Sequence, residues 1–224
     1  MRLLAISAAV AFSLAAAPLA QAAPEQQRAV DEATNVVREI HAGGNDIAAK
    51  ARELIEHSRA VLIVPELVKA GFIFGAQGGT GVLLARTGHG HWSDPAFYDL
   101  GAGSFGFQIG VEVSQVVLII MSDRALNAVM ENKVKLGAEA GLAVATLGAG
   151  AEASTTTNAG ADIYVIAESK GLFGGVAIEG GVMSPHHDWD VAYYGRDVSA
   201  RDIVTRGAVS NPGANALRHA LGQI

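Results

Sequence analysis

Residues 99–114, DLGAGSFGFQIGVEVS, decide between two folds. Gly101, Gly103 and Gly106 fit the G-x-G-x-x-G pattern with which dinucleotide-binding enzymes hold a pyrophosphate. That pattern requires a helix to begin at the glycines, because the helix N-terminus supplies the N–H groups that bind the phosphates. Here bulky apolar residues instead alternate with small or polar ones over 105–113, which predicts a curved strand with one buried face. We therefore interpret these as strand glycines and the nucleotide pattern as a coincidence.

The same alternation recurs on both sides of this stretch. It predicts about six or seven strands, including segments at 79–86, 116–121, 134–144, 161–168 and 172–183. A glycine within a strand costs roughly 0.5–1 kcal/mol relative to alanine, so the many glycines among the chain's 27 that lie in these segments indicate a geometric use. We expect an α+β fold with a glycine-rich, strongly curved antiparallel sheet, closed or nearly closed like a barrel. N- and C-terminal helices cover it.

Apolar residues at helical spacing and capping residues predict the helices. We expect a short strand over 60–64 and then a helix of one or two turns that begins at Pro65 and ends at Gly71. The other expected helices are 24–41, a second one capped by Asn45 and running to 57, 123–130 after Ser122, one after the capping box of Ser199 and Asp202, and a last one from Asn211-Pro212 to Leu221.

The first 22 residues have the three regions of a secretory signal peptide. Arg2 precedes an apolar run, and Ala20-Gln21-Ala22 forms a cleavage site. The alternative is a retained N-terminal anchor helix. We expect a signal peptide at 1–22, an amphipathic helix within 23–44 and a single domain at 45–224, and we expect the cleaved protein to be periplasmic or secreted.

The charge balance bounds the partners. The chain has 16 basic and 22 acidic residues and a net charge of −6, which makes it a poor general binder of nucleic acids and of anionic membranes. It has no cysteine, so it has neither a disulfide framework nor a thiolate metal site. We expect no nucleic-acid partner and no cofactor.

Four segments in this order resemble the SYLF family, also called the Ysc84-type actin-binding or lipid-binding domain. They are GAQGGTGVLLARTGHGHWSDP, GFQIGVEVSQVVLIIMS, KLGAEAGLAVATLGAGAEAS and ESKGLFGGVAIEGGVM. The resemblance covers about 46–221. The residues that match the family pattern, which we expect to be structural, are Gly78, Gly79, Gly81, Trp92, Gly110, Glu112, Gly171, Leu172, Phe173, Gly174, Gly175, Glu179 and Gly180.

The resemblance implies a binding function. Eukaryotic members bind phosphoinositide membranes, some bind actin filaments, and bacterial members are exported and described as lipid-binding. We expect this chain to have the bacterial layout, with a signal peptide, one domain and no SH3 module. The layout implies an exported, non-catalytic protein that binds a phospholipid or a membrane surface, and it makes actin an implausible partner. The alternatives are an envelope structural or protein-interaction module that uses the exposed sheet face, and an enzyme that uses Glu112 or Glu179.

Two groups of residues are candidates for lipid contact. They are Arg28, Val30, Val37 and Arg38 on the first helix, and Lys133, Lys135 and Lys170 in the sheet region, with Arg124 near them. The first helix also carries several acidic residues and an apolar stripe of small side chains, which favours packing on the sheet over insertion into a bilayer. Both interpretations of this helix stay open.

Other polar residues point weakly to chemistry. The histidines at 89 and 91 and at 186–187, with Asp188 and Asp190, make a zinc or copper site conceivable, but both groups are expected in loops, where histidines are solvated. Glu112, Glu139, Glu168 and Glu179 either form a structural polar network or contain an acid–base pair. A deep apolar cavity favours lipid binding, a flat exposed apolar patch favours protein binding, and two buried carboxylates in a cleft favour an enzyme.

Overall fold

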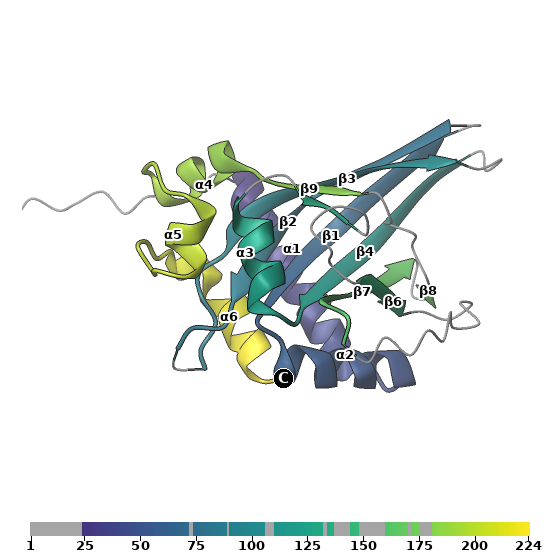
Figure 1. The fold of residues 1–224 in the computed structure, drawn as a ribbon, viewed down its shortest axis with the longest axis horizontal. Coiled ribbons are helices and arrows are strands. Elements are labelled where there is room, and N and C mark those ends of the chain that lie inside the picture. Colours follow the sequence, from purple (N-terminus) through teal and green to yellow (C-terminus); the bar gives the residue numbers. More distant parts are fainter. Residues whose placement is uncertain are drawn as a thin grey trace, which may run out of the picture.

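The computed structural model describes residues 24–71, 74–88, 90–105, 110–131, 134–136, 144–147, 160–169, 172–174 and 181–224. The fold is α+β, with one curved sheet and helices packed on it (Figure 1). The described helices are α1 (Pro24–Ala42), α2 (Asp46–His57), α3 (Asp123–Glu131), α4 (His187–Tyr194), α5 (Ala200–Val204), the 3-10 helix η1 (Pro212–Ala214) and α6 (Asn215–Gly222). The described strands are β1 (Ala60–Gly71), β2 (Phe74–Ala85), β3 (Ala96–Phe105), β4 (Gly110–Ile120), β5 (Val134–Lys135), β6 (Val144–Leu147), β7 (Ile163–Ser169), β8 (Leu172–Gly174) and β9 (Val182–Pro185).

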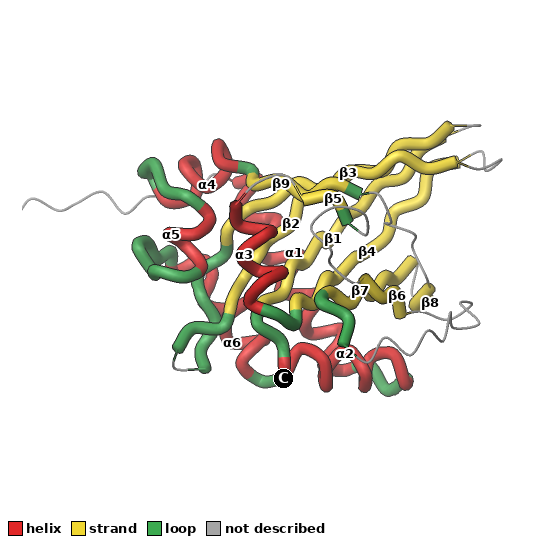
Figure 2. Tube along the Cα trace, in the orientation of Figure 1, coloured by secondary structure: helices red, strands yellow, loops and turns green. Residues whose placement is uncertain are grey.

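The sheet is the expected curved antiparallel one. Its strand order is β5-β9-β3-β2-β1-β4-β7-β6, and β8 also pairs with β7. All described pairs are antiparallel except β6 with β7. The end strands β5 and β6 do not pair with each other among the described residues. The described sheet is therefore curved but not closed into a barrel. Figure 2 shows α3 to α6 gathered at one end, while the far ends of β1 to β4 project beyond the helices.

The stretch at 99–114 is two strands and not one. β3 ends at Phe105 and β4 begins at Gly110, and they are not neighbours, because β3 pairs with β2 and β4 with β1. Residues 106–109 lie outside the described part. Four residues separate the two strands, an even number, so the bulky apolar residues Phe105 before them and Val111 after them are both odd-numbered. The sequence pattern therefore looks like that of one continuous strand. The glycines described here lie in strands, as predicted.

The prediction of a helix from Pro65 to Gly71 is wrong, because these residues belong to strand β1. The pairing register shifts by one residue between Ile63 and Val68 against β2, and also shifts between Val64 and Leu67 against β4. This bulge contains Pro65. Proline donates no backbone N–H, and a bulge is one of the few places in a sheet where that loss is tolerated.

The bulge explains two of the glycines on the neighbouring strand. A Cβ at Gly79 would overlap the carbonyl oxygen of Glu66 and lie 2.9 Å from Val64 Cγ1. A Cβ at Gly81 would overlap the carbonyl oxygen of Ile63 and lie 2.8 Å from Val64 Cγ2. Both positions therefore require glycine, because the backbone of β1 approaches β2 too closely for any side chain.

Most expected helices are confirmed with their caps. Asn45 Oδ1 accepts from Ala48 N at 2.8 Å, Ser122 Oγ accepts from Ala125 N at 3.1 Å, and Ser199 Oγ accepts from Asp202 N at 3.2 Å. The prediction of a loop after Pro185 is wrong, because residues 187–194 form helix α4. This short helix has no strong apolar stripe and depends on tertiary contacts: the rings of Trp189 and Tyr193 lie 5.6 and 5.2 Å from the ring of Phe97.

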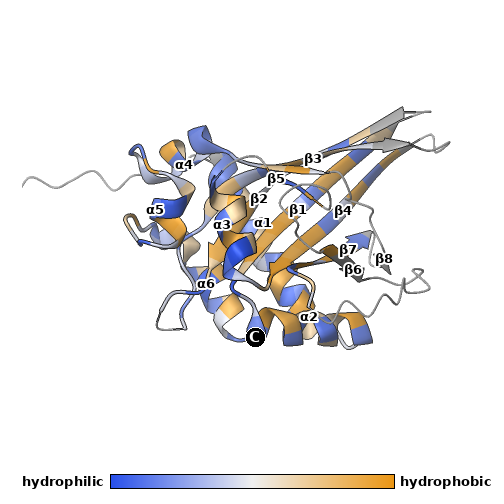
Figure 3. Ribbon diagram, viewed as in Figure 1, coloured by the Kyte–Doolittle hydropathy of each residue, from blue (hydrophilic) through white to orange (hydrophobic). Residues whose placement is uncertain are grey.

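The core lies between the sheet and the helices at the helical end. Both faces of the sheet are covered there, so 60–64 and 116–120 are buried without alternation. Towards the far end, alternation returns in β1 and β4, as the hydropathy colouring indicates (Figure 3). The expected signal peptide, Glu139 and most of the segments expected as strands at 134–144 and 172–183 lie outside the described residues.

Candidate functional site

The lipid-contact residues expected on α1 are engaged within the protein. Val30 and Val37 are buried in the core, so their side chains are not available to a lipid in this structure. Arg28 Nε lies 3.4 Å from Glu32 Oε1, and Arg38 donates to Asn35 Oδ1 at 3.5 Å. The apolar side of α1 thus packs on the sheet, as expected in the first of the two interpretations of this helix.

The expected basic spot is only partly described. Lys135 is exposed on β5, but Lys133 and Lys170 lie outside the described residues. Arg124 forms an ion pair with Asp162, with Nη2 and Oδ2 2.6 Å apart. The basic spot formed by these four residues therefore stays a prediction, because two of its members lie outside the described residues.

The candidate chemical groups that the structure describes lie in separate parts of the fold. Glu112 pairs in register with Lys69, Glu168 lies on β7, and Glu179 is outside the described part. His186 Nδ1 lies 3.0 Å from Asp99 Oδ1, and His187 Nε2 lies 3.2 Å from Asp197 Oδ1. No group of three His, Asp or Glu side chains in the described ranges is placed to hold a metal ion.

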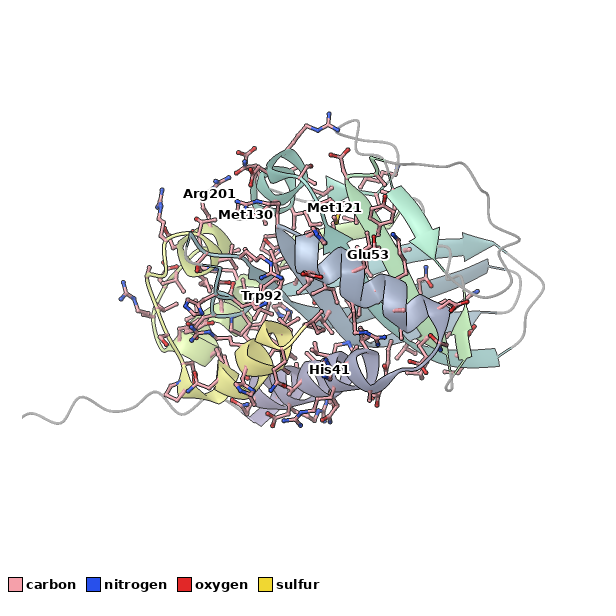
Figure 4. The ribbon with its side chains drawn as sticks, turned by 90° about the horizontal axis from the view of Figure 1, so that it is seen from below. His41, Glu53, Trp92, Met121, Met130 and Arg201 are labelled. Atoms are coloured by element: carbon pink, nitrogen blue, oxygen red, sulfur yellow. The ribbon has the colours of Figure 1, made fainter. Side chains whose placement is uncertain are left out.

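The family-pattern residues divide into two groups. Gly79 and Gly81 face the bulge of β1, and Trp92 is buried at the helical end beside α6, with the guanidinium of Arg86 4.5 Å from its ring centre (Figure 4). Gly78, by contrast, faces solvent. Gly110 and Glu112 lie at the start of β4, and Leu172, Phe173 and Gly174 form β8. Gly171, Gly175 and Gly180 are outside the described residues.

Strand register places small and apolar residues together on the solvent side of the far end of the sheet. Val68 pairs with both Val113 and Gly78, Gly78 pairs with Gly101, and Gly101 pairs with Val182. Paired residues point to the same side of a sheet, so these five form one row across five strands. The next row towards the tips continues the surface with Val111, Ala70, Ala76 and Gly103. We call the nine residues of these two rows the open face.

The open face exposes large apolar side chains. Val68 is 42% exposed, Val113 43%, Val111 70% and Val182 37%, and they are the large hydrophobic residues with the highest exposure in the described part. Gly78 and Gly101 form the floor of a shallow groove of about 380 Å³, which Thr80, Asp99 and Ser184 line on its polar side. Contiguous exposed apolar surface with a polar rim is typical of interaction sites.

The glycines of the open face lie where the surrounding atoms leave room for a larger side chain. A Cβ at Gly78 would come no closer than 3.8 Å to its nearest neighbour and one at Gly101 no closer than 3.9 Å, while Gly103 has nothing within 4 Å. None of the three has a positive φ. Glycine within a strand lowers stability, so these positions are more simply explained by a need for a surface without side chains.

The fold and this surface define an α+β protein with an exposed apolar sheet face. Residues 101–224, more than half of the chain, match the model of the Ysc84 family, described as Las17-binding protein actin regulator. The chain belongs to this family.

Relatives include the SH3 domain-containing YSC84-like protein 1 of Rattus norvegicus, 35% identical over 144 residues, and that of Homo sapiens, 34% identical over 144 residues; each alignment covers 64% of this chain and 42% of the relative. LAS seventeen-binding protein 3 of Saccharomyces cerevisiae is 29% identical over 165 residues, with 72% of this chain and 36% of the relative covered. The chain thus spans less than half the length of these curated relatives.

These names correct one expectation. From the expected bacterial layout, actin is an implausible partner, but the family is described as an actin regulator and the yeast relative is named for binding Las17. That expectation is therefore wrong as a guide to partners. No helix in the described residues is both long enough and apolar enough to span a membrane.

Proposed function

We propose that this chain is a non-catalytic protein-binding module that docks its partner on the open face. The observation that carries this proposal is the group of exposed valines around side-chain-free glycines, with no packing reason for the glycines. A flat exposed apolar patch is the feature that favours protein binding over a lipid cavity or a catalytic cleft.

The family supplies the partner class. The description of the family model names actin regulation and Las17 binding, so we propose a protein partner of this class, and actin and Las17 are the two proteins that test it. A curved sheet face that presents backbone and short side chains suits the close approach of a partner's larger side chains, which then supply the buried contacts of the interface.

The double substitution Val68→Gln with Val113→Gln tests the open face. It replaces two paired apolar side chains by neutral polar ones, so the expected result is a loss of affinity of about tenfold or more with little change in melting temperature. The measurement is co-sedimentation with filamentous actin, and capture by purified Las17 in parallel.

The matched control is Ala208→Gln with Ala216→Gln, at two exposed positions at the helical end. It should leave binding unchanged. Failure of the unsubstituted protein to bind both actin and Las17 would overturn the proposal, and so would equal binding by the two double variants.

A second candidate function is attachment to a membrane surface. Val111, the most exposed of the valines, lies near the tip of β4, where an apolar side chain can enter the interfacial region of a bilayer. The same variants, co-sedimented with neutral and with anionic liposomes, separate this candidate from protein binding. Sedimentation with liposomes that depends on Val68 and Val113 favours the membrane, and its absence removes this candidate.

We also propose that residues 1–22 are removed on export and that the rest of the chain acts as one domain in the periplasm or outside the cell, where a protein partner docks on the same open face that actin and Las17 test. The signal-like segment supports this. N-terminal sequencing of the protein recovered from a bacterial host tests it: a start at Ala23 is expected, and retention of residues 1–22 would contradict export by cleavage.

A further inference from the structure

Acidic residues border the open face along the side where α1 crosses the sheet. Glu66 lies in the bulge of β1, two residues before Val68, and Glu168 pairs with Gln115, two residues from Val113. Glu32 and Glu39 are seven residues apart on α1, so they share one side of the helix. We call Glu32, Glu39, Glu66 and Glu168 the acidic band.

The members of the acidic band interact across elements. Burial and then the charge of Glu66 raise the pKa of Glu32, and burial and then the charge of Glu39 raise the pKa of Glu168. The first effect agrees with the packing of α1 on β1 and β2, and the second indicates that Glu39 acts on Glu168 through charge. Glu32 and Glu66 also line one small groove together with Thr80 and Arg28. Thr80 is two residues from Gly78 on the same side of β2, which connects the band to the open face.

The band carries like charges that the protein only partly neutralises. Arg28 forms the ion pair with Glu32. No ion pair within 4.0 Å is found for Glu39, Glu66 or Glu168 among the described residues. Carboxylates gathered at the edge of an apolar surface attract a cationic partner and repel an anionic one.

The shape of the surface indicates the kind of segment that fits it. α1 already packs an apolar side on the covered part of this sheet face, through Val30 and Val37 among others. Beside it, the open face spans the strands β4, β1, β2, β3 and β9, about 19 Å at the usual strand spacing, which is the length of about three and a half helical turns. A second amphipathic helix can therefore lie next to α1.

We propose that the partner segment is a basic amphipathic helix, with its apolar side on the open face and its Lys or Arg residues along the acidic band. This inference rests on the proposed docking function and adds the charge and the form of the segment. The mode is that of a helix in an apolar groove, with the charged rim setting specificity.

Three synthetic peptides test the inference. Each is an 18-residue amphipathic helix with the same Leu and Ala side, and the polar side is all Lys, all Gln or all Glu. Fluorescence anisotropy against the full chain is measured at 20 and 200 mM NaCl. The Lys peptide is expected to bind about tenfold more tightly than the Gln peptide at low salt, with a smaller advantage at high salt, and the Glu peptide is expected to bind most weakly.

Two variants of equal charge locate the effect. Glu32→Gln, Glu39→Gln, Glu66→Gln and Glu168→Gln together should remove the advantage of the Lys peptide. The matched control, Glu53→Gln, Glu56→Gln, Glu131→Gln and Asp197→Asn, changes exposed acids outside the band and should retain it. Equal binding of the Lys and Gln peptides, or an unaltered advantage in the band variant, overturns the inference.

The variant Val68→Gln with Val113→Gln separates this inference from the proposed function. If it removes the binding of every peptide while the band variant changes nothing, the open face stands as a docking surface and the basic helix does not. If it leaves Lys-peptide binding intact, the attraction is not anchored on the open face and the inference fails. Absence of binding by all peptides also overturns the inference, while the actin and Las17 measurements decide the proposed function independently.

Discussion

Alanine at Gly79 or at Gly81 is expected to destabilise the fold by about 3 kcal/mol, because the new methyl group meets backbone and not a flexible side chain. The added carbon would overlap the carbonyl oxygen of Glu66 in one case and of Ile63 in the other. The bulge of β1 would have to move away from β2, and the register of both strands depends on it. Urea unfolding, followed by far-UV circular dichroism, measures the change in free energy.

The control for this prediction is alanine at Gly78 of β2 or at Gly101 of β3, on the other side of the same sheet. There the new methyl group has space, with nearest atoms 3.8 and 3.9 Å away. Removing glycine from an extended segment reduces the freedom of the unfolded chain, so these variants should be unchanged or more stable by up to about 1 kcal/mol. Equal destabilisation at all four positions would contradict the division of the glycines into structural and surface positions.

Stability is expected to fall as the pH rises from 5 to 8, and Asp190 is expected to account for on the order of 2–3 kcal/mol of the fall. Asp190 is fully buried in α4, its Oδ1 accepts from Phe97 N at 2.9 Å, and its Oδ2 has no hydrogen-bond partner among the described residues. Burial raises the pKa of this carboxyl to about 7, against which the hydrogen bond from Phe97 acts only partly. The folded protein thus keeps a proton that the unfolded chain loses near pH 4, so stability decreases up to about pH 7 and then levels off.

The variant Asp190→Asn isolates this contribution. The amide keeps an acceptor for Phe97 N and cannot ionise, so the variant should be more stable than the unsubstituted protein at pH 8 and have a smaller slope between pH 5 and 8. Thermal melts at half-unit pH intervals give both curves. Parallel curves for the two proteins would show that Asp190 does not titrate in this range.

The sequence predicts the sheet and most of the helices because both depend on local patterns. Alternation, capping residues and helical spacing identify α1, α2, α3 and the curved antiparallel sheet. Pro65 is assigned to the wrong element, because the sequence alone does not distinguish a proline that begins a helix from a proline in a bulge. Only the pairing with the neighbouring strand shows the bulge. α4 is missed because its stability comes from contacts with Phe97, which lies far away in the sequence.

The candidate site is less predictable than the fold. The sequence identifies Gly78 and Gly79 as one motif, and only strand pairing shows that Gly79 faces the bulge while Gly78 faces solvent. Alternation shows that one side of β4 is apolar, but not whether a helix covers it. Val30 and Val37 are covered by the sheet, and Val68 and Val113 are not covered, although all four are valines in amphipathic segments.

The measurement that tests the central claim most directly is the affinity of the double variant Gly78→Leu with Gly101→Leu for actin and for Las17. Two leucines fill the groove of the open face, and both positions have room for side chains. A melting temperature within a few degrees of the unsubstituted protein, together with an affinity lower by about tenfold or more, is the predicted result. A folded variant that binds its partner with unchanged affinity would contradict the assignment of the open face as the docking surface.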